Sequence, residues 1–251
     1  MTSRALIAVT FSLSLLGCVS TNSRFKTAPA EQQASTNMQL AIEYLKIGKM
    51  TESRNFIERA LEQDGDNPDV QMTAGLVYER LKEPQKAERG YATAYRIGKK
   101  NPNITNAYAG FLCRSGKTQQ GEKLFVEAAA SPLYQTPEVA LVNAGVCVRS
   151  TGDMVDAEKY FVRALAIRPN YPEALLQIGN IQFDRGDSKE ALDTVQRYLA
   201  VNPPAPEILW LGFRAQRKLG DNNAAAAFAR RVQTEFPNSE QALMMRSGRE
   251  R

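Results

Sequence analysis

The sequence predicts an all-α protein, folded as a right-handed superhelical solenoid of six helical hairpins. A pattern of apolar and small residues returns every 34 residues, from about residue 34 to about residue 239. Glycines end the first helix of most copies, and prolines stand where the next copy begins. Because each hairpin buries its apolar side only against its neighbours, six stacked copies form one continuous core. We therefore expect one elongated folded unit.

Residues 1–17 are predicted to be a lipoprotein signal peptide. Arg4 gives a positive start, residues 5–16 are apolar and uncharged, and residues 15–18 (LLGC) resemble the bacterial lipobox. The apolar stretch is too short to remain as a membrane-spanning helix. The resemblance implies that Cys18 becomes an acylated amino terminus, carrying palmitate among its chains. The alternative is an ordinary secretory signal cut nearby, which leaves Cys18 as a free thiol.

A polar segment follows the signal peptide. Residues 18–33 are predicted to be a flexible tether between the lipid and the first hairpin. Val19, not Asp, follows Cys18. By resemblance to lipoprotein sorting signals, this points to the outer membrane, with the folded array facing the periplasm.

The fourth copy of the repeat shows the pattern most fully. Its first predicted helix carries Leu141 and Gly145, Gly152 turns the chain, and Phe161 follows on the second helix. This order resembles the tetratricopeptide repeat (TPR), and the frame extends in both directions. The predicted repeats are 34–67, 68–101, 102–135, 138–171, 172–205 and 206–239, and residues 240–251 form a C-terminal tail or cap.

Composition argues against catalysis and against nucleic-acid binding. The chain contains no histidine, which removes Ser-His and Cys-His nucleophile pairs and histidine-ligated zinc. No phosphate-binding glycine motif is present. The net charge of +5 is spread over the chain instead of being concentrated in basic runs. We expect no catalytic residue, metal, cofactor, nucleic acid or small-molecule substrate; an enzyme is the disfavoured alternative.

Two cysteines stand on the predicted first helices of neighbouring repeats. Cys113 belongs to the third repeat and Cys147 to the fourth, in a chain with an export signal. In an oxidising compartment we expect a disulfide between them. Two buried apolar thiols are the alternative, because the sequence does not give the distance between the two α-carbons.

The first helix of each TPR hairpin lines the concave face of the array, which defines a candidate groove. The predicted partner-binding residues are Met38, Ile42, Leu45, Met72, Leu76, Val142, Val146 and Trp210. An exposed apolar stripe with methionines suits a partner's helix or extended peptide. Because Arg214, Arg217 and Lys218 follow Trp210, we expect the groove to change from apolar to basic. Alternatively, the tether or a neighbouring molecule covers the first-repeat stripe.

Three segments resemble the pilotins, a family of type IV pilus biogenesis lipoproteins: residues 108–113 (YAGFLC), 131–134 (SPLY) and 143–147 (NAGVC). The resemblance covers nearly the whole chain. It implies a lipid-anchored adaptor that helps the pilus secretin reach the outer membrane and assemble into its ring. It also maps the paired cysteines of the family onto Cys113 and Cys147, and the lipidated cysteine onto Cys18.

The expected function is therefore a non-enzymatic adaptor whose partners are a secretin subunit and, through the lipid, the outer membrane. A general periplasmic TPR scaffold for envelope protein assembly is the alternative. The two differ in whether loss of the protein removes secretin multimers.

Overall fold

The structure is a computed structural model that describes residues 29–98 and 101–248. In this part of the chain all regular elements are helices, which form six antiparallel hairpins and one last helix. The helices are α1 Ala30–Lys46, α2 Met50–Asp64, α3 Pro68–Arg80, α4 Pro84–Ile97, α5 Pro102–Arg114, α6 Thr118–Ala130, α7 Pro137–Arg149, α8 Met154–Ile167, α9 Pro172–Arg185, α10 Ser188–Val201, α11 Pro206–Leu219, α12 Asn222–Glu235 and α13 Glu240–Ser247. The predicted all-α solenoid is confirmed.

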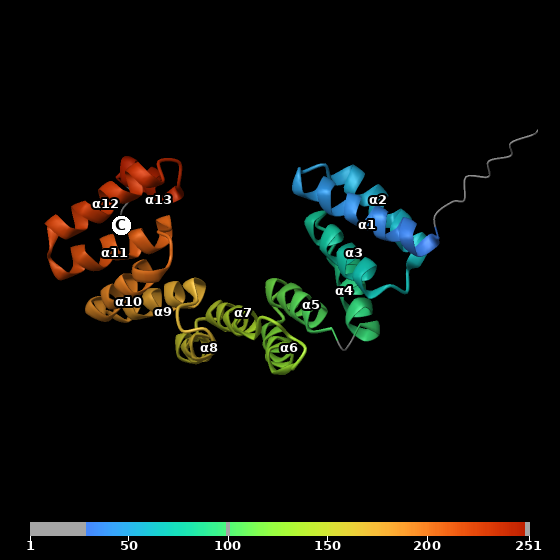
Figure 1. The fold of residues 1–251 in the computed structure, drawn as a ribbon, viewed down its shortest axis with the longest axis horizontal. Helices are drawn as coiled ribbons and strands as arrows, with labels where there is room; N and C mark the ends of the chain where they lie inside the picture. Colours follow the sequence, from blue (N-terminus) through green and yellow to red (C-terminus); the bar gives the residue numbers. More distant parts are fainter. Residues whose placement is uncertain (1–28, 99–100, 249–251) are drawn as a thin grey trace, which may run out of the picture.

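The hairpins follow one another along an arch. The first two and the last two hairpins rise on either side of α6, α7 and α8, which lie at its base (Figure 1). Each hairpin packs its two helices together and contacts the next hairpin along the chain. Helices α1, α3, α5 and α7 also contact one another in this order. They therefore form one continuous surface on the concave side of the arch.

Local sequence signals place the helix ends. Proline occupies the first turn of α3, α4, α5, α7, α9 and α11, where its missing N–H has no helical partner to lose. Asn67 and Asn101 cap α3 and α5 by accepting hydrogen bonds from backbone N–H groups of the first turn. Gly186, with φ of +98°, ends α9 in the left-handed region that favours glycine.

The turn of the second hairpin has no glycine at the corresponding position. Lys82 stands where the 34-residue frame places glycine in the first hairpin, and it adopts φ of +59°. This is the only non-glycine residue with positive φ in the described part of the chain. A side chain with a Cβ is strained in this conformation.

Close helix contacts within the hairpins explain several helical glycines. A Cβ added to Gly145 on α7 would lie 2.5 Å from the ring of Phe161 on α8. A Cβ added to Gly90 on α4 would lie 2.7 Å from the backbone nitrogen of Gly75 on α3. Larger residues at these places would force the two helices apart.

A disulfide joins the third and fourth hairpins. Cys113 on α5 and Cys147 on α7 have their sulfurs 2.13 Å apart and their α-carbons 5.7 Å apart. The connection from α6 to α7, residues 131–136, makes this repeat two residues longer than the 34-residue frame. Its Tyr134 packs into the same core cluster as Ala140 and Ala144. The connection is therefore part of the packed array.

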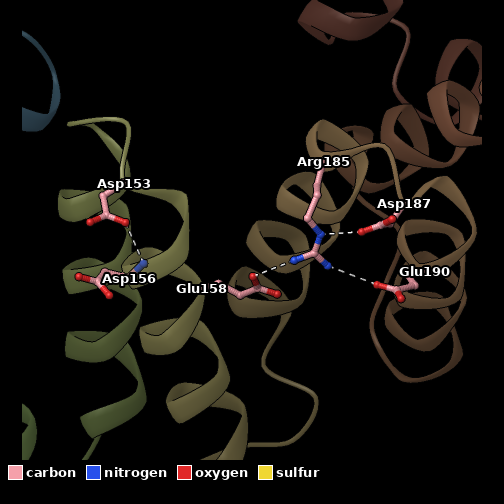
Figure 2. Close-up of polar contacts among 6 residues, drawn as sticks. All are labelled: Asp153, Asp156, Glu158, Arg185, Asp187 and Glu190. Carbon is pink, nitrogen blue, oxygen red and sulfur yellow. Dashed lines mark hydrogen bonds and ion pairs between the residues drawn. The ribbon is translucent and has the colours of Figure 1, made fainter.

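Charged side chains connect hairpins along one edge. Arg185 at the end of α9 pairs with Glu158 on α8 and with Asp187 and Glu190 at the start of α10 (Figure 2). Asp153 accepts a hydrogen bond from the backbone N–H of Asp156 and so caps α8. One arginine thus links the fourth and fifth hairpins through exposed pairs of modest individual strength.

The structure extends the array at its amino-terminal end and closes it with a short helix at the other end. Helix α1 begins at Ala30, inside the segment 18–33 predicted as a tether, because Ala30 and the next three residues are good helix formers placed after Pro29. At the other end α13 packs Ala242 and Met245 onto the last hairpin, as a cap does. The predicted signal peptide 1–17 and the lipid-attachment residue Cys18 lie outside the described residues.

Within residues 29–98 and 101–248, none of the helices is long and apolar enough to cross a membrane.

Candidate partner-binding groove

A cavity of about 580 Å³ opens on the concave side of the first four hairpins. Its apolar lining includes Ile42 from α1, Met72 and Leu76 from α3, and Val146 from α7. These four residues were predicted from the sequence, and the structure brings them together around one space. We call this cavity the groove.

Small and polar residues of α5 occupy the middle of the groove. Asn106, Ala107 and Gly110 line it between the apolar residues of α3 and Val146 of α7. Across the gap to α7, Asn143 Nδ2 donates a hydrogen bond of 3.2 Å to Asn106 Oδ1. The groove therefore combines apolar walls with an amide pair.

The frame of the repeat could have located two of these residues. Asn106 follows Met72 by one repeat, and Gly110 follows Leu76 by one repeat. Neither residue was among the predicted groove residues, all of which are apolar with large side chains. Their positions in the repeat indicate that they line the groove, although neither side chain is a large apolar one.

An ion pair closes one side of the groove. Arg114 on α5 donates two hydrogen bonds to Glu79 on α3, of 2.7 Å from Nε and 3.0 Å from Nη2. Tyr91 on α4 donates a third to the same carboxylate, at 3.1 Å. Such a bidentate pair fixes the guanidinium plane and ties the second hairpin to the third.

Electrostatics at this pair favour the charged carboxylate. Burial raises the pKa of Glu79, but the hydrogen bonds and positive charge of Arg114 outweigh burial, so the pKa lies below its ordinary value. Burial and the neighbouring carboxylate of Glu79 raise the pKa of Tyr91 above its ordinary value. Tyr91 therefore remains a neutral donor throughout the physiological range.

Four predicted partner-binding residues lie elsewhere, two of them in the core. Leu45 is only 9% exposed, because the end of α1 packs it into the core of the first hairpins. Val142 is 6% exposed and packs into the core cluster that contains Phe161 and Ile178. Assigning Leu45 and Val142 to an open surface was wrong.

The other two, Met38 and Trp210, are partly buried. Met38 packs against the core of the first hairpins. Trp210 lies on α11 with its ring centroid 5.2 Å from that of Phe213, and it packs on the core of the last hairpins. Neither residue lines the groove.

The expected basic end of the concave face is partly neutralised. Arg214 on α11 lies 3.5 Å from Asp184 on α9 and 4.0 Å above the centre of the Phe183 ring. Arg149 at the end of α7 lies 3.9 Å from the same carboxylate.

The cysteine pair belongs to the groove itself, since Cys113 and Cys147 both line it.

In the described residues, no three histidine, cysteine or acidic side chains are grouped so that they could hold a metal ion. The groove offers apolar surface, amide groups and one ion pair. These suit the binding of a polypeptide.

Comparison with known proteins follows the architecture. Sequence models of the tetratricopeptide repeat match residues 38–102, 149–216 and 208–239. The chain is a TPR protein. Among curated proteins, this TPR chain is 23% identical over 242 residues to the type IV pilus assembly protein PilF of Pseudomonas aeruginosa, covering 95% of this chain and 96% of PilF.

Solved structures agree with this relation. The crystal structure of PilW, described as a widely conserved type IV pilus biogenesis factor, superposes with a TM-score of 0.72 at 29% identity, covering 85% of this chain and 98% of PilW. The structure of Pseudomonas aeruginosa PilF has a TM-score of 0.69 at 20% identity, covering 87% of this chain and 99% of that one, and supports the fold. The TPR protein is homologous to PilF and PilW.

Proposed function

We propose that this TPR protein is a pilotin: an outer-membrane lipoprotein adaptor that binds the secretin of the type IV pilus and promotes its outer-membrane localisation and multimer assembly. The observation that carries the proposal is the apolar groove, which gathers Ile42, Met72, Leu76 and Val146 around one cavity. Homology to PilF along nearly the whole chain supports a role in pilus biogenesis. The proposed activity is binding, without catalysis.

The mechanism is tethering. Acyl chains on Cys18 hold the array at the inner surface of the outer membrane, because two or more chains anchor a protein where one gives only marginal binding. The groove then holds a secretin segment at the same surface. Confinement raises the local concentration of subunits, which favours ring assembly.

The groove supplies binding energy through desolvation. Apolar side chains that meet Ile42, Met72 and Leu76 leave water, and this burial is the main favourable term in most protein association. Arg114 and Glu79 already neutralise each other within the protein. A partner segment beside them therefore needs no charged side chain of its own. The groove thus selects an apolar segment.

The test compares secretin in three strains: wild type, a strain lacking the protein, and a strain carrying Cys18→Ala. We expect secretin multimers to disappear in the deletion strain and to be mislocalised in the Cys18→Ala strain, measured by membrane fractionation and heat-resistant multimers on gels. Normal rings in both strains would reject the pilotin proposal. Other envelope proteins in pull-downs, with secretin multimers intact, would instead support the general periplasmic scaffold.

A further inference from the structure

The first hairpin has an apolar end face that no neighbouring hairpin covers. Leu40 on α1 is 36% exposed, whereas in the second, fourth and fifth repeats the residue at this position is 8% exposed or less: Ala74, Ala144 and Ile178. In those repeats the preceding hairpin packs against the helix that carries the residue. Helix α1 is the first helix in the described part of the chain, so Leu40 has no such neighbour.

Two aromatic rings continue this face. Tyr44 lies one turn after Leu40, and its ring stacks on that of Phe56 on α2, with the centroids 5.2 Å apart. Tyr160, at the position of Phe56 three repeats later, reaches the preceding hairpin, where it donates a hydrogen bond of 2.6 Å to Glu122 on α6. Leu40 and the half-buried Tyr44 and Phe56 therefore form the surface on which a preceding hairpin would pack. We call these three residues the end face.

Charges around the end face are mixed. Lys49 and Arg59 lie 5.8 Å and 5.6 Å from the centres of the Tyr44 and Phe56 rings, and Glu43 stands on the same helix as Tyr44. Burial of apolar surface, more than charge, therefore decides what covers this face.

The other end of the array is closed by the chain itself. Helix α13 follows the last hairpin and packs Ala242 and Met245 onto it, which leaves them 0% and 8% exposed. Solenoids need such covers, because the outermost repeat would otherwise present apolar surface to water. The amino-terminal end has the same need, and there too the chain continues beyond the hairpin.

The segment that leads into α1 carries a suitable side chain at a suitable distance. Phe25 is the one aromatic residue among residues 19–28. It precedes Ala30 by five residues, which is up to about 17 Å of extended chain, and Leu40 lies about 15 Å along the helix from Ala30. Because the segment belongs to the same chain, its local concentration at the end face is far above that of a second copy.

We propose that residues 19–28 fold back along α1 and cap the end face, with the ring of Phe25 packed against Leu40 and Tyr44. The flanking Arg24 and Lys26 keep their charged groups in water while their stems lie along the protein.

Such a cap would shorten the predicted tether. The chain between Cys18 and Phe25 spans at most about 24 Å, whereas the chain between Cys18 and Ala30 spans up to about 41 Å. With Phe25 held at the end face, the first hairpin, which contributes Ile42 to the groove, stays closer to the membrane. This consequence rests on the proposed lipid anchor, whereas the cap itself does not.

The experiment measures disulfide formation in residues 18–251 carrying Cys18→Ala, which leaves the two native cysteines of the disulfide. Thr27→Cys is combined with Thr36→Cys, one turn before Leu40 on the end-face side of α1. The matched control combines Thr27→Cys with Ser35→Cys, the neighbouring exposed position, two turns before Ile42 on the side of α1 that lines the groove. Dilute protein is oxidised in a glutathione buffer and followed by non-reducing gels and peptide mass spectrometry.

We expect the pair with Thr36→Cys to form a disulfide within one chain about tenfold faster than the pair with Ser35→Cys, because the cap holds Thr27 on the end-face side. Adding Phe25→Ser or Leu40→Ser should remove this difference. Equal rates in the two pairs overturn the inference. A faster control pair also overturns it, because the segment would then lie over the groove. A product that links two chains overturns it in favour of a second copy on the end face.

Thermal unfolding provides a second readout with the native residues at positions 27, 35 and 36. Phe25→Ser and Leu40→Ser are each expected to lower the midpoint by about 3 °C, and the double variant no further, because either change alone removes the same contact. Leu133→Ser, at an exposed leucine far from α1 in sequence, should add its effect to that of Phe25→Ser. Additive effects of Phe25→Ser and Leu40→Ser contradict the cap. Neither measurement involves lipid or secretin, so the cap and the pilotin proposal can fail separately.

Discussion

The disulfide between Cys113 and Cys147 provides a test of how the middle of the arch is stabilised. Reduction removes one covalent link and leaves both side chains in place. The cysteines are 34 residues apart, and closing a loop of this length lowers the entropy of the unfolded chain. The loop-entropy relation gives a stabilisation of about 3.8 kcal/mol at 25 °C for this separation.

This free energy converts into a measurable shift of the unfolding temperature. For a chain of this size, one kcal/mol corresponds to about 2 to 4 °C, so reduction is expected to lower the midpoint by about 8 to 15 °C. The assay is thermal unfolding followed by circular dichroism at 222 nm, with and without reductant. A Cys113→Ser/Cys147→Ser variant serves as the control, because reductant has no bond to break between these positions in it.

The reasoning would be refuted by one clear result. If oxidised wild type, reduced wild type and the double serine variant all unfold at the same temperature, the link adds nothing to stability. Such a result would mean that α5 and α7 stay together through packing alone, both folded and partly unfolded. A lower midpoint that appears equally in the serine variant and in reduced wild type supports the calculation.

Three further changes test other parts of the structure. Lys82→Gly is expected to stabilise the protein by about 1 kcal/mol because it relieves strain at positive φ; a lower midpoint in urea unfolding would contradict this. Glu79→Gln is expected to destabilise the protein at pH 7, and the difference from wild type should shrink as pH falls below 4.5 through the lowered pKa of Glu79, because a depressed pKa gives stability that protonation removes; a difference that stays constant down to pH 2 would exclude the ion pair as its cause. Ile42→Asp is expected to weaken partner binding at least tenfold without loss of helical content, whereas Ile47→Asp, an exposed change at the end of the same helix, should not; helix loss in Ile42→Asp would place Ile42 in the core.

Much of the fold follows from local signals in the sequence. Proline is disfavoured inside a helix, and Pro102 and Pro137 each begin one. Gly186 ends α9 with a left-handed backbone conformation. Because such signals act within a few residues, their recurrence every 34 residues was enough to predict six hairpins and their order. Among these hairpin turns, the one without glycine, at Lys82 between α3 and α4, adopts the same positive φ with a less suitable residue.

The groove was predictable in part. Ile42, Leu76 and Val146 stand at equivalent repeat positions, and Met72 lies one helical turn before Leu76, so all four fall on one face of the array and line one cavity. Leu45, which lies three residues after Ile42, is buried instead. The difference is a rotation of less than one turn around α1, and only the neighbouring helices decide which side of that rotation is covered.

The sequence by itself determined the hairpins and their number, because these depend on periodicity within a single repeat. The tertiary structure alone decided the burial of Val142, the juxtaposition of Asn106 with Asn143 and the pairing of Arg114 with Glu79. Each of these depends on the distance and rotation between helices of different repeats. Those quantities arise from packing many side chains at once, and no local pattern in the chain encodes them.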